Sequence, residues 1–293
     1  MSFVSFVPFV LKPAAHTSPP TKPPRDRRAD HRATARALYF HMPLITTQAI
    51  ILSALRYSET SKIVRLATRD HGVQSAIAKG AMRPRSRYGA ALQVLSEGQA
   101  QYLAKEHREL HVLTAFDLHQ LHVSLAADLG RYATASALAE VMLRFAPADP
   151  HPESFDLFRD ALTALEDAPA DEVEALGFRL LWHLVSVLGF APSLDACARD
   201  GAALPEGALP FSTREGGALC ATCAAEHGAT RLPAEARADL TALLDPNASL
   251  PRLDPRHASA HRRLLARYVH HHLSEGTELP ALDFWQQRPW VPA

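Results

Sequence analysis

Apolar and polar positions alternate in two different ways along the chain. In its first half, short runs rich in β-branched residues are separated by polar turns, a pattern that predicts β-strands. Five strands with no long helix between them are typical of a small barrel, so we predict a five-stranded OB-fold over residues 44–122, with an SH3-like barrel as the alternative. The runs span residues 48–57, 62–68, 72–78, 94–103 and 109–116.

From Asp117 onward the apolar residues recur every three or four positions, which predicts amphipathic helices. Prolines and glycines separate three such stripes, and a fourth lies near the C-terminus. We therefore predict an α+β multidomain chain whose α-helical domain spans residues 123–190 and 230–277. An insertion over residues 191–229 separates its two parts, and residues 278–293 form a C-terminal tail. The first stripe comprises Leu125, Leu129, Tyr132, Ser136, Ala139 and Leu143.

The opening 43 residues differ from the rest. They are crowded with Pro, Arg and Thr, a composition that cannot bury a core. Positive charge follows the apolar opening instead of preceding it, unlike the order in a secretory signal. We predict that residues 1–43 are either a disordered basic arm or a misread extension upstream of a natural start at Met42.

Composition narrows the class of protein. Of 293 residues, 47% are hydrophobic and 21% charged, which is typical of a globular chain. No run approaches the roughly 20 apolar residues of a membrane span. Three cysteines argue against a secreted disulfide framework, which normally uses an even number. We expect a cytoplasmic protein with no membrane partner.

Charge is unevenly distributed, although 31 basic residues balance 31 acidic ones overall. Residues 44–122 carry ten Lys/Arg and six Asp/Glu, whereas residues 123–293 carry fourteen and twenty-three. Clustered cations raise the local potential whatever the net charge, so the front half is suited to a polyanion.

A basic loop follows the third predicted strand, with four cations and a tyrosine within ten residues. Such a loop on a small barrel suits single-stranded nucleic acid, because cations follow phosphates while aromatic rings stack on bases. Tyr57 and Tyr102 are further possible platforms but lie in strand patterns and are expected mainly in the core. The alternative is a solvated loop with Tyr88 as a core plug. The predicted DNA-binding residues are Lys62, Arg65, Lys79, Arg83, Arg85, Arg87 and Tyr88.

The predicted insertion contains all three cysteines, with Cys220 and Cys223 in a CxxC motif. Together with Cys197 they have the spacing of a zinc ribbon that lacks one cysteine. Asp200 or His227 could supply the fourth ligand of a structural zinc ion. The alternative is a loop of reduced, partly buried thiols.

Catalytic motifs are not evident. The sequence has no GxxxxGK[ST], HExxH or GxSxG motif, and the acidic residues of the predicted barrel show no metal-binding spacing. His270, His271 and His272 are consecutive, so they fan out around a helix instead of converging on one ion. We predict a protein that is not an enzyme.

The order of barrel, helices, cysteine knuckle and closing helix resembles the bacterial RecO family of recombination mediators. The resemblance extends over residues 45 to 275, and its departure is Asp200 where the family's zinc knuckle has a second cysteine. The matching segments are residues 49–52, 57–64, 78–81, 188–192, 211–212, 216–217 and 220–223, together with Gly72.

This resemblance implies a DNA repair function without catalysis. It implies an OB-fold that binds single- and double-stranded DNA and anneals complementary strands, partnership with RecR, and loading of RecA at the nucleoid. It also implies binding to the acidic C-terminal tail of single-stranded DNA-binding protein. Candidates for that contact are Arg131 with Tyr132, or Arg262 with Arg263. The alternative is a protein-interaction adaptor whose DNA binding is incidental.

Overall fold

Five β-strands form a closed barrel in the computed structural model, which describes residues 43–104, 108–274 and 276–290. Their order around the barrel is β1-β2-β3-β5-β4, and only the β3–β5 pair is parallel among these pairings. The five-stranded OB-like prediction is thereby confirmed. The expectations for residues 1–42 lie outside the described residues. The strands are β1 (Leu44–Arg56), β2 (Lys62–Thr68), β3 (Gly72–Ala78), β4 (Glu97–Leu103) and β5 (Leu110–Gln120).

Closure depends on the long first strand. The first half of β1 pairs with β4, while its second half pairs with β2. A register shift between Ile51 and Ser53 interrupts the β1–β2 ladder, and such a bulge bends a strand and increases its twist. Alternate residues of each strand then point inward, and Ile51, Leu66 and Leu113 are fully buried in the barrel core.

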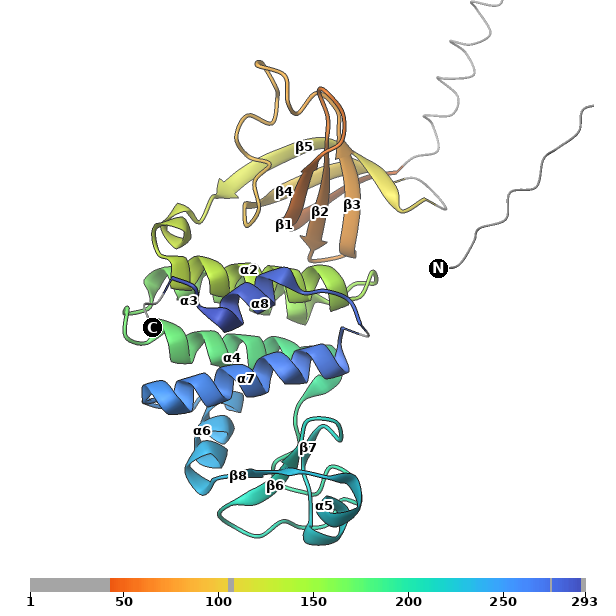
Figure 1. Cartoon of the computed structure of the whole chain (residues 1–293). Helices are drawn as coiled ribbons and strands as arrows, with labels where there is room; N and C mark the ends of the chain where they lie inside the picture. The colour runs from red at the N-terminus through yellow and green to blue at the C-terminus, as the bar shows by residue number, and fades with distance from the viewer. Residues whose placement is uncertain (1–42, 105–107, 275, 291–293) are drawn as a thin grey trace, which may run out of the picture. The chain divides into compact units, whose positions relative to one another are not determined.

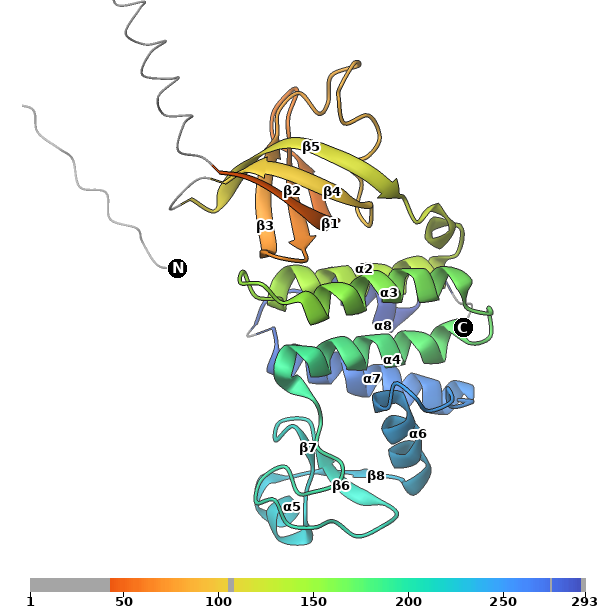
Figure 2. The ribbon, with the colours of Figure 1, turned by 180° about the vertical axis from the view of Figure 1, so that it is seen from behind.

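The second half of the chain is helical, as predicted. Figure 1 shows α2, α3 and α8 near the barrel, with α4 and α7 beyond them, and Figure 2 shows the same order from behind. The largest fully buried side chains of their shared core include Phe155, Phe178, Trp182 and Tyr268. The elements are η2 (Val123–Ala127), α2 (Leu129–Phe145), α3 (Pro152–Asp167), α4 (Val173–Val185), η3 (Ser186–Phe190), α6 (Ala234–Leu244), α7 (Pro255–His272) and α8 (Pro280–Gln287).

One segment, Val173–Phe190, is long and apolar enough to cross a membrane by length and composition alone, and half of it is buried. Within it, Phe178, Leu181 and Trp182 have no exposed surface and pack in the helical core. Core packing therefore accounts for this run of apolar residues.

The first predicted helical stripe is partly wrong. Asp128 caps α2 by accepting from the backbone N–H of Arg131, which separates Leu125 from the helix. Leu129 and Tyr132 are 53% and 41% exposed. The buried face of α2 instead combines small residues such as Ala135 with larger ones such as Leu138 and Met142.

Helices α6 and α8 lie outside the four predicted stripes. Helix α6 follows the insertion, and α8 lies in the segment expected to be a tail. Leu282 and Trp285 of α8 are buried three residues apart, and α8 lies along α2. The backbone N–H groups of Ala281 and Leu282 donate to the Glu140 carboxylate of α2, at 2.9 Å each.

The insertion between η3 and α6 forms a small unit. Its strands, β6 (Leu209–Ser212), β7 (Gly217–Ala218) and β8 (Thr230–Leu232), form an antiparallel sheet in the order β7-β6-β8. Helix α5 (Ala221–His227) lies between β7 and β8 along the chain.

The turn between β2 and β3 faces the helices. Arg69 forms a two-pronged ion pair with Asp156 of α3, at 3.2 and 3.0 Å, and the Val73 N–H donates to the Pro147 carbonyl. A Cβ at Gly72 would lie 2.5 Å from the Ala148 carbonyl group, so only glycine allows this approach. The opposite ends of β2 and β3 therefore point away from the helices.

Candidate nucleic-acid interface and metal-binding cluster

Three strand ends meet at the rim of the barrel that points away from the helices. Arg56 of β1 pairs with Lys62 of β2, and Lys62 pairs with Ala78 of β3. Lys79 follows directly and begins the loop between β3 and β4, which Figure 1 shows extending from this rim. The predicted basic loop is thus brought beside two further cations, Arg56 and Lys62.

Backbone and side-chain hydrogen bonds hold this loop against the barrel. The Met82 N–H donates to the Thr60 carbonyl in the β1–β2 turn at 3.0 Å, and Lys62 Nζ donates to the Leu92 carbonyl at 2.9 Å. Gly80, with a φ of +75°, allows the chain to turn directly after the strand. The loop is therefore anchored at both ends.

The four loop cations project into solvent. Within the described residues, no carboxylate lies within ion-pair distance of any of them. Guanidinium groups without a carboxylate partner keep donors available for an incoming anion, and phosphate is an anion whose geometry they match well. These cations are Lys79, Arg83, Arg85 and Arg87.

Tyr88 does not lie where the DNA-binding prediction needs it. Its side chain is 3% exposed, and its hydroxyl donates to the Leu113 carbonyl at 2.7 Å inside the barrel. Burial raises the pKa of Tyr88, although the nearby Arg87 opposes that rise. The Arg87 guanidinium carbon lies 5.1 Å from the centre of the Tyr88 ring. Tyr88 therefore fills the core and positions Arg87, and its ring is covered against stacking on a base.

Tyr57 has the opposite placement. The expectation that it lies in the core is wrong, because it is 63% exposed at the end of β1. Leu55 and Met82, on the adjoining strand and loop, are 65% and 42% exposed. Tyr102, by contrast, is 1% exposed, as expected for a core residue. The sequence signal that Tyr57 is exposed was its position between Arg56 and the polar turn that follows, because a strand end next to a turn lies at the rim of the barrel.

The two predicted strand cations are less free than those of the loop. Lys62 is half-buried and already donates to Leu92. Arg65 is half-buried on β2, and its Nε is buried without a hydrogen-bond partner. We therefore rank the loop residues above both as phosphate ligands.

The three thiols and one carboxylate come together in the insertion. One ligand atom each from Cys197, Asp200, Cys220 and Cys223 lies within 4.8 Å of all the others. Asp200 Oδ2 lies 3.4 Å from Cys220 Sγ and 3.3 Å from Cys223 Sγ. His227 is outside this group and contacts Glu226 instead.

These distances suit a cation with tetrahedral coordination. Metal–sulfur and metal–oxygen bonds of about 2.3 and 2.0 Å at a tetrahedral angle separate the two ligand atoms by about 3.5 Å. Burial, with contacts to Cys220 and Asp200, raises the pKa of the Cys223 thiol to about 12. A bound cation would reverse this effect, because it stabilises the thiolate. The residues present could therefore hold a metal ion.

Of the proposed partner-binding residues, Arg131 is already engaged. Its guanidinium donates to the carbonyls of Leu165, Glu166 and Ala168, which end α3. These are the groups that a helix C-terminus leaves unsatisfied, so Arg131 stabilises α3. Tyr132, at 41% exposed, remains accessible beside it.

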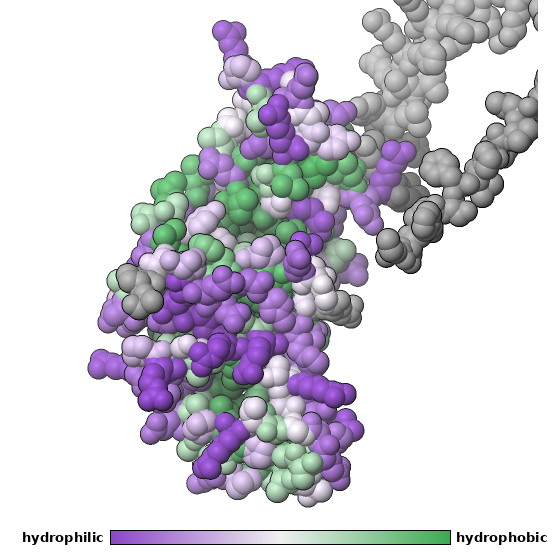
Figure 3. All heavy atoms as spheres, in the orientation of Figure 1, coloured by the Kyte–Doolittle hydropathy of each residue, from purple (hydrophilic) through white to green (hydrophobic). Residues whose placement is uncertain are grey.

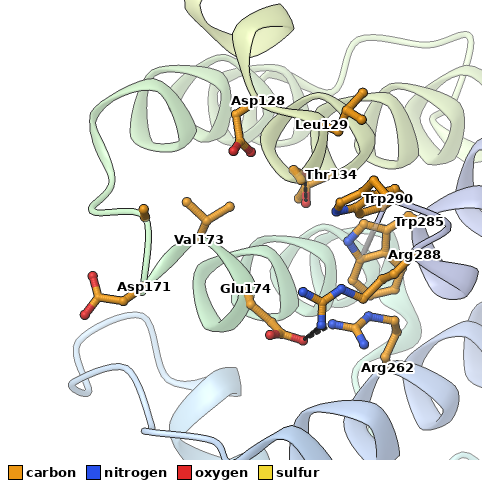
Figure 4. A pocket seen from close by; sticks show the side chains of 12 residues that line it. Asp128, Leu129, Thr134, Asp171, Val173, Glu174, Arg262, Trp285, Arg288 and Trp290 are labelled. Atoms are coloured by element: carbon orange, nitrogen blue, oxygen red, sulfur yellow. Dashed lines mark hydrogen bonds and ion pairs between the residues drawn. The ribbon is translucent and has the colours of Figure 1, made fainter. Parts of the chain in front are cut away.

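Arg262 lies in a pocket that sequence reasoning only partly anticipated (Figure 4). Arg262 and Arg288 both donate to the Glu174 carboxylate. The Arg262 guanidinium carbon also lies 5.7 Å from the centre of the Trp285 ring. Trp290 lines the same pocket, which has a volume of about 310 Å³. Two cations and two indole rings could meet an acidic group with an aromatic neighbour. Such a group would have to compete with Glu174 for both arginines, and Asp128 and Asp171 also line the pocket.

Arg263 points elsewhere. It is exposed on α7 and donates to the Ser259 hydroxyl at 2.6 Å, away from the pocket that contains Arg262. The predicted pair of adjacent arginines is therefore divided between two faces of one helix, because neighbouring helical residues are about 100° apart.

Comparisons with known proteins agree with this architecture. Residues 42–122 match the family described as "Recombination protein O N terminal", and residues 126–279 match "Recombination protein O C terminal". A DNA repair protein RecO of Anaeromyxobacter dehalogenans is 34% identical over 251 residues, which cover 83% of this chain and 96% of the relative. One of Symbiobacterium thermophilum is 32% identical over 234 residues, covering 78% and 92%.

Proposed function

Because the chain belongs to the RecO family of DNA repair proteins, we propose that it is a non-catalytic recombination mediator that binds DNA at the rim of its barrel. In this proposal it anneals single strands coated by single-stranded DNA-binding protein and, with RecR, helps to load RecA. It acts in the cytoplasm, at the nucleoid.

The exposed, unpaired cations of the β3–β4 loop are the observation that supports DNA binding most directly. Phosphates supply most of the affinity of non-specific DNA binding, and each contact releases counterions. Tyr57 stands beside these cations with its ring exposed, so an unpaired base can stack on it while the loop holds the adjacent phosphates.

Annealing requires little more than this geometry. Cations reduce the repulsion between two strands, and base pairing supplies the free energy. No group has to move a proton or activate water, so the absence of catalytic motifs in the sequence fits a mediator.

A charge reversal tests the proposed interface. Arg83→Glu/Arg85→Glu should weaken binding of single-stranded DNA and lower the logarithmic salt slope by about 0.7 for each lost phosphate contact. The control, Arg144→Glu/Arg231→Glu, makes the same charge change at exposed positions outside the barrel. Equal DNA affinity and annealing in both variants would contradict the proposed interface and favour the adaptor function.

The pocket with Arg262 and Arg288 is our candidate for the acidic tail of single-stranded DNA-binding protein. Such a tail presents carboxylates and an aromatic ring, which guanidinium groups and indole rings can both contact. Arg288 is the more accessible of the two cations, with 32% of its side chain exposed against 8% for Arg262.

Zinc is the metal that we assign to the cysteine cluster. Three thiolates and a carboxylate form a soft, four-coordinate donor set that favours Zn²⁺ over Mg²⁺ or Ca²⁺. Bound zinc would join Cys197 to the CxxC turn, two segments about twenty residues apart, and so stabilise a small unit with little core of its own.

A further inference from the structure

Helix α7 carries a second row of cations, far along the chain from the barrel. Arg256, Arg263 and Arg267 are all exposed on this helix. Their spacings of seven and four residues place them within about 40° of one another around the helix, along about 16 Å of its axis. Ala260 lies between the first two, so no bulky side chain interrupts the row.

Each guanidinium in this row retains free donors. No carboxylate lies within ion-pair distance of any of the three among the residues that the structure describes. Arg263 donates one N–H to Ser259, and Arg267 donates Nε–H to the Arg263 carbonyl. Asp254, at the start of the helix, accepts from the backbone N–H groups of Arg256 and His257.

The row contrasts with its surroundings. The second half of the chain carries fourteen basic and twenty-three acidic residues, so three adjacent unpaired arginines are not typical of it. Helix α7 also has no large exposed hydrophobic residue. Figure 3 shows strongly hydrophilic side chains across the face where Figure 1 places α7.

These features favour a linear polyanion over a folded protein partner. Protein interfaces are usually anchored by buried aromatic or aliphatic side chains, which this face does not offer. A nucleic-acid strand needs only a row of cations, and guanidinium groups can bind its phosphates through two parallel hydrogen bonds.

We propose that the arginine row of α7, comprising Arg256, Arg263 and Arg267, is a second DNA-backbone site that holds a second strand. The inference rests on the proposed function, in which the barrel rim binds the first strand. With separate sites for two strands, one molecule can hold both at once, which raises the concentration of each strand near the other and so favours annealing.

A two-strand binding assay tests this proposal. A fluorescent oligothymidylate of about 15 nucleotides, near the upper site size of one OB-fold, first saturates the rim. A second oligothymidylate with a different dye then reports further binding by energy transfer, and non-complementary strands exclude pairing between them. The variants are Arg263→Glu/Arg267→Glu for the row, Arg263→Lys/Arg267→Lys as its charge-preserving partner, and Arg144→Glu/Arg231→Glu as the control.

The glutamate variant should bind the first strand within about twofold of the unmodified chain, but bind the second about tenfold more weakly and anneal slowly. The lysine variant should retain most second-strand binding, which separates loss of charge from loss of fold. Normal second-strand binding and annealing in the glutamate variant would overturn the proposal, as would an equal loss in the control. Poly-glutamate serves as a probe for an acidic protein partner. If the glutamate variant bound both strands normally but lost poly-glutamate binding, the row would be a protein site and the proposal would also be overturned.

Failure of the underlying proposed function gives a different result. If Arg83→Glu/Arg85→Glu leaves first-strand affinity unchanged, the rim is not the first site. Second-strand binding by Arg263→Glu/Arg267→Glu then still tests the arginine row on α7. If Arg263→Glu/Arg267→Glu weakens the first strand instead of the second, α7 is the primary site and the two-site proposal is wrong.

Discussion

His122 Nδ1 lies 2.7 Å from Glu166 Oε2 where the barrel joins the helices. The His122 side chain is completely buried, and its Nε2 lies 3.6 Å from the Glu97 carboxylate of β4. Gln120, at the end of β5, donates to the same Glu166 carboxylate at 2.7 Å. One carboxylate at the end of α3 therefore holds the segment through which the chain leaves β5 and the barrel.

We expect this contact to make stability depend on pH. Burial alone would raise the pKa of Glu166, but hydrogen bonds from Ser124, His122 and Gln120 lower it below its ordinary value of 4.5. The folded state thus favours ionised Glu166, and this contribution is complete above about pH 4.5 and is lost as the pH falls below it.

Urea unfolding across this pH range measures the effect. Glu166→Gln should lower the free energy of unfolding at neutral pH, and the difference from the unmodified chain should narrow as the pH falls towards about 3. Glu206→Gln, at an exposed position, is the control. A difference that stays constant with pH would mean that ionisation of Glu166 does not contribute.

Tyr88→Phe should affect stability more than DNA binding. The substitution removes the hydrogen bond to the buried Leu113 carbonyl, at a cost of about 1 kcal/mol, while keeping the ring in the core. Thermal unfolding and oligothymidylate titration measure the two effects. A large loss of affinity in a folded Tyr88→Phe protein would show that this hydroxyl reaches DNA.

Tyr57→Ala should have the reverse effect. Its ring is exposed, so stability should change by less than about 0.5 kcal/mol. Single-strand binding should weaken by about 1–3 kcal/mol if a base stacks on the ring. Tyr57→Phe, which keeps the stacking surface, should bind nearly normally, and similar affinities for the alanine and phenylalanine variants would exclude stacking.

The metal assignment predicts a difference between two candidate ligands. Purified protein should contain about one zinc per chain, Asp200→Ala should contain much less, and Asp200→Cys should retain the metal more strongly. His227→Ala should retain the content of the unmodified chain, because His227 lies outside the cluster. Mass spectrometry measures the zinc content. If His227→Ala lost zinc while Asp200→Ala retained it, His227 and not Asp200 would be the fourth ligand.

The candidate tail pocket predicts separate roles for two arginines. Arg288→Gln should weaken binding of an acidic peptide with a terminal aromatic residue by about tenfold, as expected for loss of a charged hydrogen bond. Arg131→Ala should mainly lower the melting temperature, because Arg131 caps α3. Fluorescence anisotropy and thermal unfolding separate the two. Unchanged peptide binding in Arg288→Gln would exclude this pocket.

Local pattern predicted the strands well because alternation, turns and strand ends are all short-range features. It was less successful for Leu129 and Tyr132, whose spacing matches a buried stripe although other residues, such as Ala135 and Leu138, form the buried face of α2. The side that a helix buries depends on its neighbours, and α8, which packs on α2, was not predicted.

The site shows the same division. Clustered charge identified Arg83 and Arg85 as exposed cations, since charge avoids the core. The two tyrosines were harder, because the strand pattern placed Tyr57 in the core and the basic loop placed Tyr88 at the surface, and the structure has the reverse. The carbonyl that holds the Tyr88 hydroxyl in the core belongs to Leu113, which lies 25 residues away, so local sequence could not reveal it.

The loop between β3 and β4 has two parts with different freedom to change. Residues 83–87 form a projecting tip, whereas Met82, bonded to Thr60, fixes the outgoing part, and Tyr88 and Leu92 fix the part that returns to β4. Doubling a flexible loop costs only about 0.6 kcal/mol in closure entropy. The tip can therefore be lengthened, shortened or recharged to alter DNA affinity while the barrel keeps its register, which makes it the natural point at which to graft new binding specificities.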